Sequence, residues 1–408
     1  MKARVLFLFF VLHLSVFSQQ EFAKSFVSVF ASDEFKGRGY VDGGNEKAAQ
    51  YLADQFARFG VKPYAQTYFQ KFGISVNTFP SPTHVIINDS ILTEGVDYIV
   101  DPYSGSSSGV FSCFYVDFFN LSKASTQIKN TVFVIDPSIT QNKDSIAILQ
   151  RLKYQLSNTH PVVWLNSGKL TWSVATEQGQ NAILEIKKET FGRPNELKID
   201  VKNEYIQHFE TQNVIGFIKG KKKKKHIVIT AHYDHLGKMG NAIFNGANDN
   251  ASGVASMLYL AQHFASKKPK YSMVFIAFGA EEVGLLGSEY YVKNPAFPLK
   301  QIKFLINLDL NGTGEEGVTV VNGTLHKKEF LKLTNINNEQ HLLEKIKVRG
   351  QAANSDHYWF TQQSVPAFFI YTMGGVSHYH DVYDRPETLP LTEFNDLTSL
   401  LIQFIDSF

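Results

Sequence analysis

The sequence predicts an α/β fold in which a mixed central sheet is covered by helices on both faces, with a β-rich domain inserted into it. Two observations lead to this prediction. After residue 212, strand-like apolar runs at 214–218, 227–230, 272–278 and 303–308 alternate with helical patterns, which is typical of α/β sheets whose strand ends carry the chemistry. Between residues 79 and 200, short β-rich runs are instead separated by Ser, Asn, Asp, Gly and Pro, which is typical of a β-rich insertion.

The length and composition are those of a globular protein with two domains, or with one large domain that carries an insertion. The chain has 408 residues, 44% of them hydrophobic and 19% charged, and a formal net charge of +2. This charge gives no reason to expect a polyanionic partner, so nucleic acid is not favoured. The single cysteine, Cys113, excludes an intramolecular disulfide, and its apolar neighbours predict a buried, inert thiol.

The first residues have the pattern of a cleavable secretory signal. A basic start precedes an apolar run over 5–16, and Ser18 provides a small residue at the expected cleavage site. The alternative is an uncleaved anchor, but His13 interrupts the run, which is also shorter than the roughly twenty apolar residues that span a bilayer. We therefore predict that residues 1–18 are a signal peptide. The mature chain is expected to be secreted or periplasmic, with no stable membrane insertion.

The remaining elements follow from the spacing of apolar residues. An amphipathic helix is expected over 45–59, with Gly60 at the position of a left-handed cap. Helical spacing also predicts a helix near 255–264 and a closing helix within 391–408. The lysine run at 219–225 joins two predicted strands, and a solvated hairpin turn explains it better than a polyanion site.

Side chains of the types that bind metals follow the predicted strands. One strand runs into His232 and Asp234, and alternation along an extended backbone points both side chains the same way, so the carboxylate could orient the imidazole. The strand at 272–278 leads to the adjacent acids Glu281 and Glu282. Two neighbouring buried carboxylates are costly unless cations neutralise them, because like charges raise each other's pKa.

Three further segments supply ligand-type side chains. Asp309 ends another predicted strand, Asp249 lies in a turn-forming segment before a helix, and His380 lies in a loop after a strand expected at 367–371. Singly, each has an ordinary explanation, such as a helix N-cap for Asp249 or a surface position for His380. Their coincidence favours a metal site. Histidine and carboxylate ligands without a thiolate suit zinc or a similar divalent ion, and two ions could share one carboxylate.

The order of these motifs closely resembles that of the secreted zinc aminopeptidase family with two co-catalytic zinc ions, in the clan of bacterial leucyl aminopeptidases and glutamate carboxypeptidase-like proteins. The resemblance is carried by AHYDHLG, GANDNASG, GAEEVGLLGS, NLDL, SDHYWF, the late histidine, and the opening segment from ASDEFKGRG to FGVKP. It covers residues 21–78 and 205–408. It implies a zinc peptidase domain formed by residues 19–78 and 205–408. The insertion at 79–204 lies where relatives can carry a protease-associated domain, and it resembles such a domain only weakly.

Carried over residue by residue, the resemblance implies two zinc ions per chain. His232 and Asp309 would bind one ion, Glu282 and His380 would bind the other, and Asp249 would bridge both. The Asp249-Asn250 peptide bond would be cis, as in the family.

The resemblance also assigns supporting roles. Glu281 matches the general base of the family, and Asp234 matches the acid that orients the first histidine. The segment Ser355-Asp356-His357 matches a motif near the cleft and is given a supporting role without metal contact. The family usually continues from the late histidine as Thr-Pro and then Asp, and this chain departs from that pattern. Asp384 is therefore assigned only a supporting position.

The activity implied is that of a metallopeptidase that releases amino-terminal residues from peptide or protein substrates, with Glu281 removing a proton from the attacking water. A glutaminyl cyclase or a carboxypeptidase on the same scaffold is the alternative among enzymes. A non-catalytic binding module of this fold is the alternative from another class. The intact ligand set, together with Glu281, argues against such a module.

Overall fold

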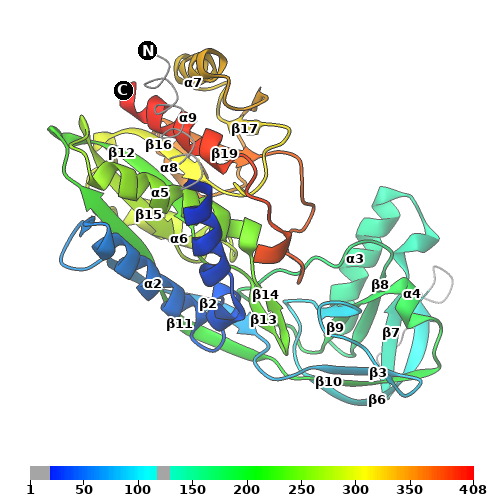
Figure 1. Ribbon diagram of the computed structural model, residues 1–408. Helices are drawn as coiled ribbons and strands as arrows, with labels where there is room; N and C mark the ends of the chain where they lie inside the picture. Colours follow the sequence, from blue (N-terminus) through cyan, green and yellow to red (C-terminus); the bar gives the residue numbers. More distant parts are fainter. Residues whose placement is uncertain (1–18, 117–128) are drawn as a thin grey trace.

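The computed structural model describes residues 19–116 and 129–408, and two large sheets organise them (Figure 1). The predicted signal peptide, residues 1–18, lies outside the described residues. Figure 1 shows the second sheet set to one side of the first. Within the described residues, no helix combines the length and the apolar character needed to cross a bilayer.

The first sheet is mixed, as the sequence predicts. Four neighbouring strands, β15, β12, β16 and β19, run parallel, whereas β11 and β17 pair antiparallel with the two outer strands of this group. The strands, in sheet order, are β1 (Lys62–Pro63), β11 (Glu204–Ile218), β15 (Tyr271–Phe278), β12 (Lys222–His232), β16 (Ile302–Leu308), β19 (Ala367–Thr372), β17 (Val318–Val321) and β18 (Ile346–Val348), and β2 (Phe69–Thr78) also pairs with β11. The carboxyl ends of the parallel strands therefore lie at one edge of the sheet.

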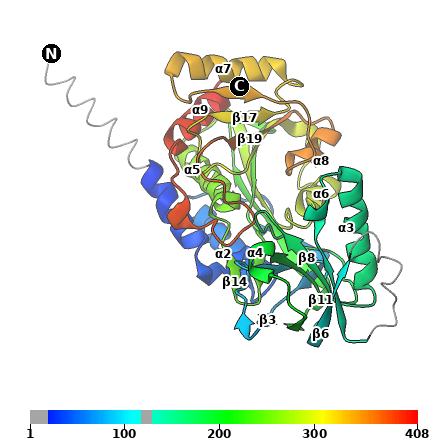
Figure 2. The ribbon, with the colours of Figure 1, turned by 90° about the vertical axis from the view of Figure 1, so that its right-hand side faces the viewer.

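Helices cover both faces of this sheet (Figure 2). In β12, Ile227 and Ile229 pack into the core on one face and Val228 into the core on the other, because successive side chains of a strand alternate. The first face is covered by residues 19–30, α2 (Gly44–Arg58), α5 (Gly253–Ala265) and α9 (Phe394–Asp406), with α7 (Lys327–Gln340) packed against α9. The second face is covered by α6 (Leu286–Lys293) and α8 (His357–Gln362).

The second sheet is formed by the segment between His84 and Val201. Its strands, in sheet order, are β4 (Ser90–Ile91), β3 (His84–Ile87), β10 (Glu196–Val201), β6 (Ser107–Val116), β7 (Thr131–Ile135), β8 (Val162–Asn166), β9 (Ile183–Lys187) and β5 (Tyr98–Val100). Helix α3 (Lys143–Ser157), which was not expected in this segment, packs on it through Leu149 and Leu156. A short helix, α4 (Lys188–Phe191), follows β9. The domain boundaries at 79–204 remain a prediction.

The two sheets share a contact region. The hairpin of β13 (Gly237–Met239) and β14 (Ala242–Phe244), which follows β12, packs into the core of the second sheet, and so does Val382 from the loop before α9. Residues that follow strands of the first sheet are therefore in direct contact with the insertion.

Two details differ from the sequence prediction. Strand β12 begins at Lys222, so most of the lysine run belongs to a strand and only its first residues form the turn. Cys113 in β6 is only partly buried, although burial still raises the pKa of its thiol to about 11, which keeps it protonated at neutral pH.

Candidate metal centre

The metal-binding types of side chain gather where the parallel strands end. His232 is the last residue of β12, Asp309 follows β16, and the pair Glu281 and Glu282 follows β15. Asp249 lies in η4 (Ala247–Ser252), between β14 and α5. The loop after β19 supplies His380. Parallel strands bring their carboxyl ends to one edge, which explains why segments far apart in the sequence meet here.

Asp249 lies between two groups of side chains. Its Oδ1 atom is 3.2 Å from His232 Nε2, and its Oδ2 atom is 3.1 Å from His380 Nε2. His232 Nε2 is also 3.3 Å from Asp309 Oδ1, and His380 Nε2 is 3.2 Å from Glu282 Oε2. The structure thus brings together all five residues predicted as ligands, and it divides them into two groups that share Asp249.

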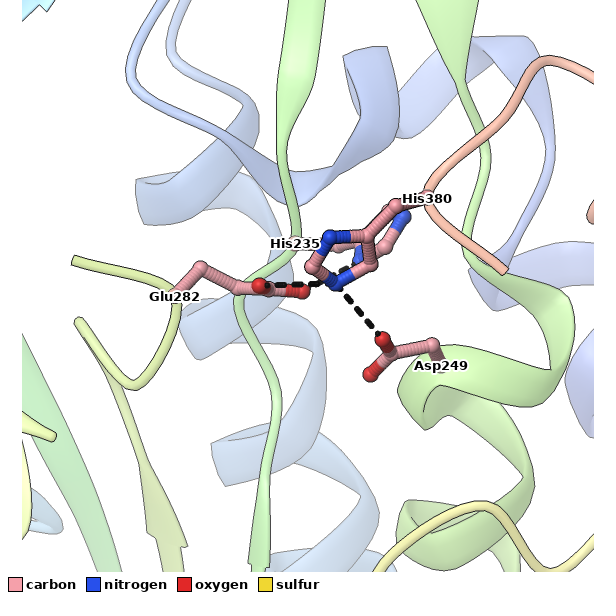
Figure 3. Close-up of side chains that lie close together, drawn as sticks. All are labelled: His235, Asp249, Glu282 and His380. Carbon is pink, nitrogen blue, oxygen red and sulfur yellow. Dashed lines mark hydrogen bonds and ion pairs between the residues drawn. The ribbon is translucent and has the colours of Figure 1, made fainter. Parts of the chain in front are cut away.

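Figure 3 shows the second group, which contains one residue that the sequence prediction missed. His235 Nδ1 lies 2.6 Å from Glu282 Oε1, and the other ring nitrogen of His235 is buried without a hydrogen-bond partner in the structure. His235 stands at the end of the AHYDH motif. If the strand continued past His232, alternation would point the His235 side chain to the opposite face. The backbone leaves the strand after His232, so alternation no longer applies to it.

The two adjacent acids have opposite proton affinities. Burial, together with the charge of Glu282, raises the pKa of Glu281 well above its ordinary value, against the opposing effect of His232. For Glu282, burial and Asp249 act in the same upward direction, but His380 and His235 outweigh them and lower its pKa to about 2. A pair of carboxyl groups whose pKa values are pushed apart in this way is typical of a division between proton transfer and charge stabilisation.

Asp234 supports the site differently from the prediction. Its carboxylate is 3.9 Å from His232 Nδ1, whereas its main-chain carbonyl oxygen is 3.1 Å from the same nitrogen. The carboxylate accepts hydrogen bonds from the Tyr40 hydroxyl at 2.7 Å and from the main-chain N–H groups of Glu281 at 3.1 Å and Glu282 at 3.3 Å. Asp234 therefore orients His232 through its backbone and positions the two acids through its side chain.

Further hydrogen bonds hold the ligand Asp309 and the Asp249 loop. The Ser355 hydroxyl donates to Asp309 Oδ2 at 2.9 Å, and Asp384 accepts hydrogen bonds from the main-chain N–H groups of Asn248 at 2.8 Å and Asp249 at 3.0 Å. The Asp249-Asn250 peptide bond is cis, as the resemblance implied.

Two buried residues of the SDH segment lie outside both ligand groups. Burial raises the pKa of Asp356 to about 7 and lowers the pKa of His357 to about 4. His357 is therefore neutral near neutral pH, whereas Asp356 is about half ionised there.

The charge balance of the site fits a divalent cation. Asp234, Asp249 and Asp309 are 0%, 3% and 6% exposed, and Arg38, the one buried arginine among the described residues, hydrogen-bonds main-chain carbonyl oxygens and not these carboxylates. The carboxylates instead raise the pKa of the neighbouring imidazoles. Burial alone would lower the pKa of His380, but Glu282 and Asp249 raise it to about 11.

The pKa of His232 is raised well above its ordinary value in the same way, by Glu281 and Asp309 against the effect of burial. In the site without metal, the acids thus favour the protonated form of both imidazoles. His380 Nε2 lies near two carboxylates but has no hydrogen bond of acceptable geometry to either. Imidazole and carboxylate donors without thiolates suit zinc.

Comparisons with known proteins bear on this region. Residues 213–405 match the family model described as Peptidase family M28. These residues, called the M28 region below, are similar to that family. The resemblance to zinc aminopeptidases that the motifs indicated is therefore confirmed for this part of the chain.

Two curated relatives of the M28 region are Aminopeptidase YwaD of Bacillus subtilis (strain 168), 44% identical over 110 residues, and a Probable zinc metalloprotease of Pyrenophora teres f. teres (strain 0-1), 38% identical over 114 residues. Each match covers 26% of this chain, and it spans only 23% and 24%, respectively, of those relatives.

Solved structures show the same fold over nearly the whole chain. BSAP, a zinc aminopeptidase from Bacillus subtilis, aligns with a TM-score of 0.69 and 20% identity over 94% of each chain. An aminopeptidase from Aneurinibacillus sp. strain AM-1 aligns with a TM-score of 0.62 and 21% identity over 94% of this chain and 92% of that one. The predicted fold class is therefore confirmed.

A cavity of about 200 Å³ adjoins four of the residues predicted to act at the metal site. Its lining includes His232, Asp249, Glu281 and Asp309, together with Leu310, Asn354, Phe369, Tyr371 and Tyr379. The ring of Tyr379 stacks on that of His380, with centroids 3.9 Å apart. The cavity can therefore bring an apolar group next to the carboxylates of the candidate metal site.

Proposed function

We propose that this protein is a zinc-dependent aminopeptidase that holds two zinc ions per chain. The observation that carries the proposal is the position of Asp249, which presents one carboxylate oxygen to each of two histidines that stand in separate ligand groups. A shared carboxylate between two such groups is the arrangement expected of a two-metal hydrolase.

The ligand assignment follows from the two groups. His232 and Asp309 would hold one ion, Glu282 and His380 would hold the other, and Asp249 would contact both. When bound, zinc ions in such a site act as Lewis acids that polarise a carbonyl group and lower the pKa of water.

In this proposal Glu281 is the general base. It lines the cavity beside His232 and Asp309, and its backbone N–H is held by Asp234. Its raised pKa makes its carboxylate a stronger base than an ordinary glutamate. Glu281 can therefore take a proton from the attacking water and hold it until the departing amine needs it.

The substrate end follows from the charges around the cavity. Of the described residues that line it, none is lysine or arginine, so nothing there pairs with the terminal carboxylate that a carboxypeptidase must bind. We therefore assign the amino terminus, and not the carboxyl terminus, as the substrate end that enters this cavity. Leu310, Phe369 and Tyr371 would then contact an apolar side chain of the first residue.

Amino-terminal acetylation tests this choice of end. The enzyme would be given a peptide library in free and acetylated form, and the products would be identified by mass spectrometry. Release of single amino-terminal residues from the free peptides alone is expected. Equal cleavage of both forms would refute the aminopeptidase proposal, and a cyclised amino terminus would identify a cyclase.

The proposal includes the location and the domain arrangement. Residues 1–18 would direct export and be removed, and the peptidase domain would comprise residues 19–78 and 205–408, interrupted by an insertion at 79–204. Amino-terminal sequencing of exported protein checks the first statement, with Gln19 expected as the first residue.

A further inference from the structure

His380 lies on a loop whose backbone is conformationally demanding. The loop joins β19 to α9, and His380 has a φ of 54°, in the left-handed region that side chains other than glycine rarely adopt. Such a conformation persists only where surrounding contacts hold it. The contacts around His380 therefore decide whether its imidazole stays in place.

One lysine of the insertion holds the loop on both sides of His380. The Lys169 ammonium group lies 2.6 Å from Asp381 Oδ2 and donates hydrogen bonds to the carbonyl oxygens of Ser377 at 3.0 Å and Tyr379 at 2.8 Å. An ammonium group has three N–H donors, and here it has three partners. Lys169 belongs to the segment between β8 and β9, more than two hundred residues before the loop.

The same segment contacts His380 itself. The main-chain N–H of Trp172 donates a hydrogen bond to the carbonyl oxygen of His380 at 2.9 Å. Trp172 is firmly anchored, because its Nε1–H donates to the carbonyl oxygen of Val100 at 2.8 Å and its ring stacks on Phe244 with centroids 4.7 Å apart. The insertion is thus hydrogen-bonded to His380 through an anchored residue.

The carboxylate of Asp381 has few other partners among the described residues. It is 5% exposed, its Oδ1 atom accepts a hydrogen bond from the Tyr383 N–H at 2.8 Å, and His378 Nδ1 lies 3.6 Å from its Oδ2 atom. Without Lys169 this buried charge would lose its nearest cation, and burial of an uncompensated charge is unfavourable. The loop would then be expected to move so that Asp381 reaches water.

We propose that the insertion is a structural part of the metal centre, in which Lys169 and Trp172 hold His380 in the position needed to bind the second ion. Lys169 is a positioning residue that touches neither metal nor substrate. The inference rests on the proposed function, since it takes His380 as a ligand. It predicts that zinc affinity depends on a residue of the second sheet's domain.

The experiment compares Lys169→Met with Lys188→Met in the full-length protein. Lys188 is a matched control, because its side chain is 45% exposed against 41% for Lys169, and its ion pair with Asp136 lies within the insertion. We expect Lys169→Met to bind the second zinc ion about tenfold to a hundredfold more weakly in a chelator competition, the usual effect of losing a group that orients a ligand. Lys188→Met is expected to match the wild type.

Hydrogen exchange gives a readout that does not need metal. In Lys169→Met, the Trp172 amide should exchange at least tenfold faster than in the wild type, and Lys169→Arg should restore part of its protection. Unchanged exchange, or unchanged affinity for the second ion, would overturn the inference. A wild-type chain that binds fewer than two zinc ions would refute the proposed function, while the exchange result would still decide whether Lys169 holds the loop.

Discussion

The clearest prediction separates the two adjacent acids. Glu281→Gln should keep both zinc ions and lose turnover, whereas Glu282→Gln should lose the second ion. The reason lies in their surroundings. Glu281 is not among the assigned ligands and an amide keeps its size, so both ions should stay bound. The site lowers the pKa of Glu282 to about 2, so it strongly favours the charge that an amide removes.

The expected magnitudes follow from the contacts. The Glu281 N–H donates to Asp234, a bond that the substitution leaves in place, so the backbone should stay in position. Loss of a general base then lowers kcat by about a hundredfold to ten-thousandfold, which is about 3 to 5 kcal/mol at about 1.4 kcal/mol per tenfold.

Glu282→Gln removes one ligand oxygen and the charge that faces His235 and His380 at 2.6 and 3.2 Å. The affinity for the second ion should fall by about a hundredfold or more, since even groups that only orient a ligand are worth about tenfold to a hundredfold. Excess zinc should restore part of the activity of this variant and none of the activity of Glu281→Gln.

The assay combines zinc content by mass spectrometry, kcat and KM on one unblocked peptide, and a zinc titration. Glu289→Gln is the matched control, because Glu289 lies on α6 and pairs with Lys293 at 2.7 Å, away from the ligands. Zinc loss in Glu281→Gln, with a full complement in Glu282→Gln, would show that the two roles are exchanged. Full activity and metal content in both variants would refute the two-metal site.

Three further predictions concern protons, backbone support and the insertion. Zinc binding at pH 8 should release protons and strengthen as pH rises, because His232 and His380 have raised pKa values in the metal-free site and bind zinc only when neutral. Calorimetry in buffers of different ionisation enthalpy measures the number of protons released. Release of no protons would contradict this prediction. Arg38→Met should lower the free energy of unfolding by about 3 kcal/mol or more in denaturant titration, because several buried carbonyl groups lose their donor. Lys153→Met should lower the free energy of unfolding by about 3 to 5 kcal/mol, because Asp101 stays buried without its cation. Adding Asp101→Asn should recover much of that stability, and no recovery would refute the ion-pair explanation.

Much of the fold was predictable from local patterns. The strand periods after residue 212 predicted the sheet, and helical spacing predicted three helices that cover its first face, whereas α6 and α8 on the second face were not predicted as elements. Helix α3 was predictable in the same way and was missed. Ile146, Leu149, Leu152 and Leu156 have helical spacing, and Asn142 caps the helix by accepting hydrogen bonds from two backbone N–H groups.

The candidate site was predictable as a set of residues but not as an arrangement. The sequence places ligand-type side chains after strands, and the parallel sheet brings those strand ends together. His235 escaped prediction because β12 ends at His232, so strand alternation does not direct its side chain. The role of Asp234 differed from the prediction because its carbonyl oxygen, not its carboxylate, is the group nearest His232 Nδ1.

The sequence by itself therefore determined which segments form strands and helices and which side chains are chemically able to bind zinc. Only the tertiary structure decided that Asp249 stands between two histidines, that Arg38 serves backbone carbonyls, and that Lys169 of the insertion holds the loop of His380. The physical reason is the separation along the sequence of the residues that are in contact. Periodicity reports the faces of one element, whereas these contacts join segments tens to hundreds of residues apart whose approach depends on how whole layers pack.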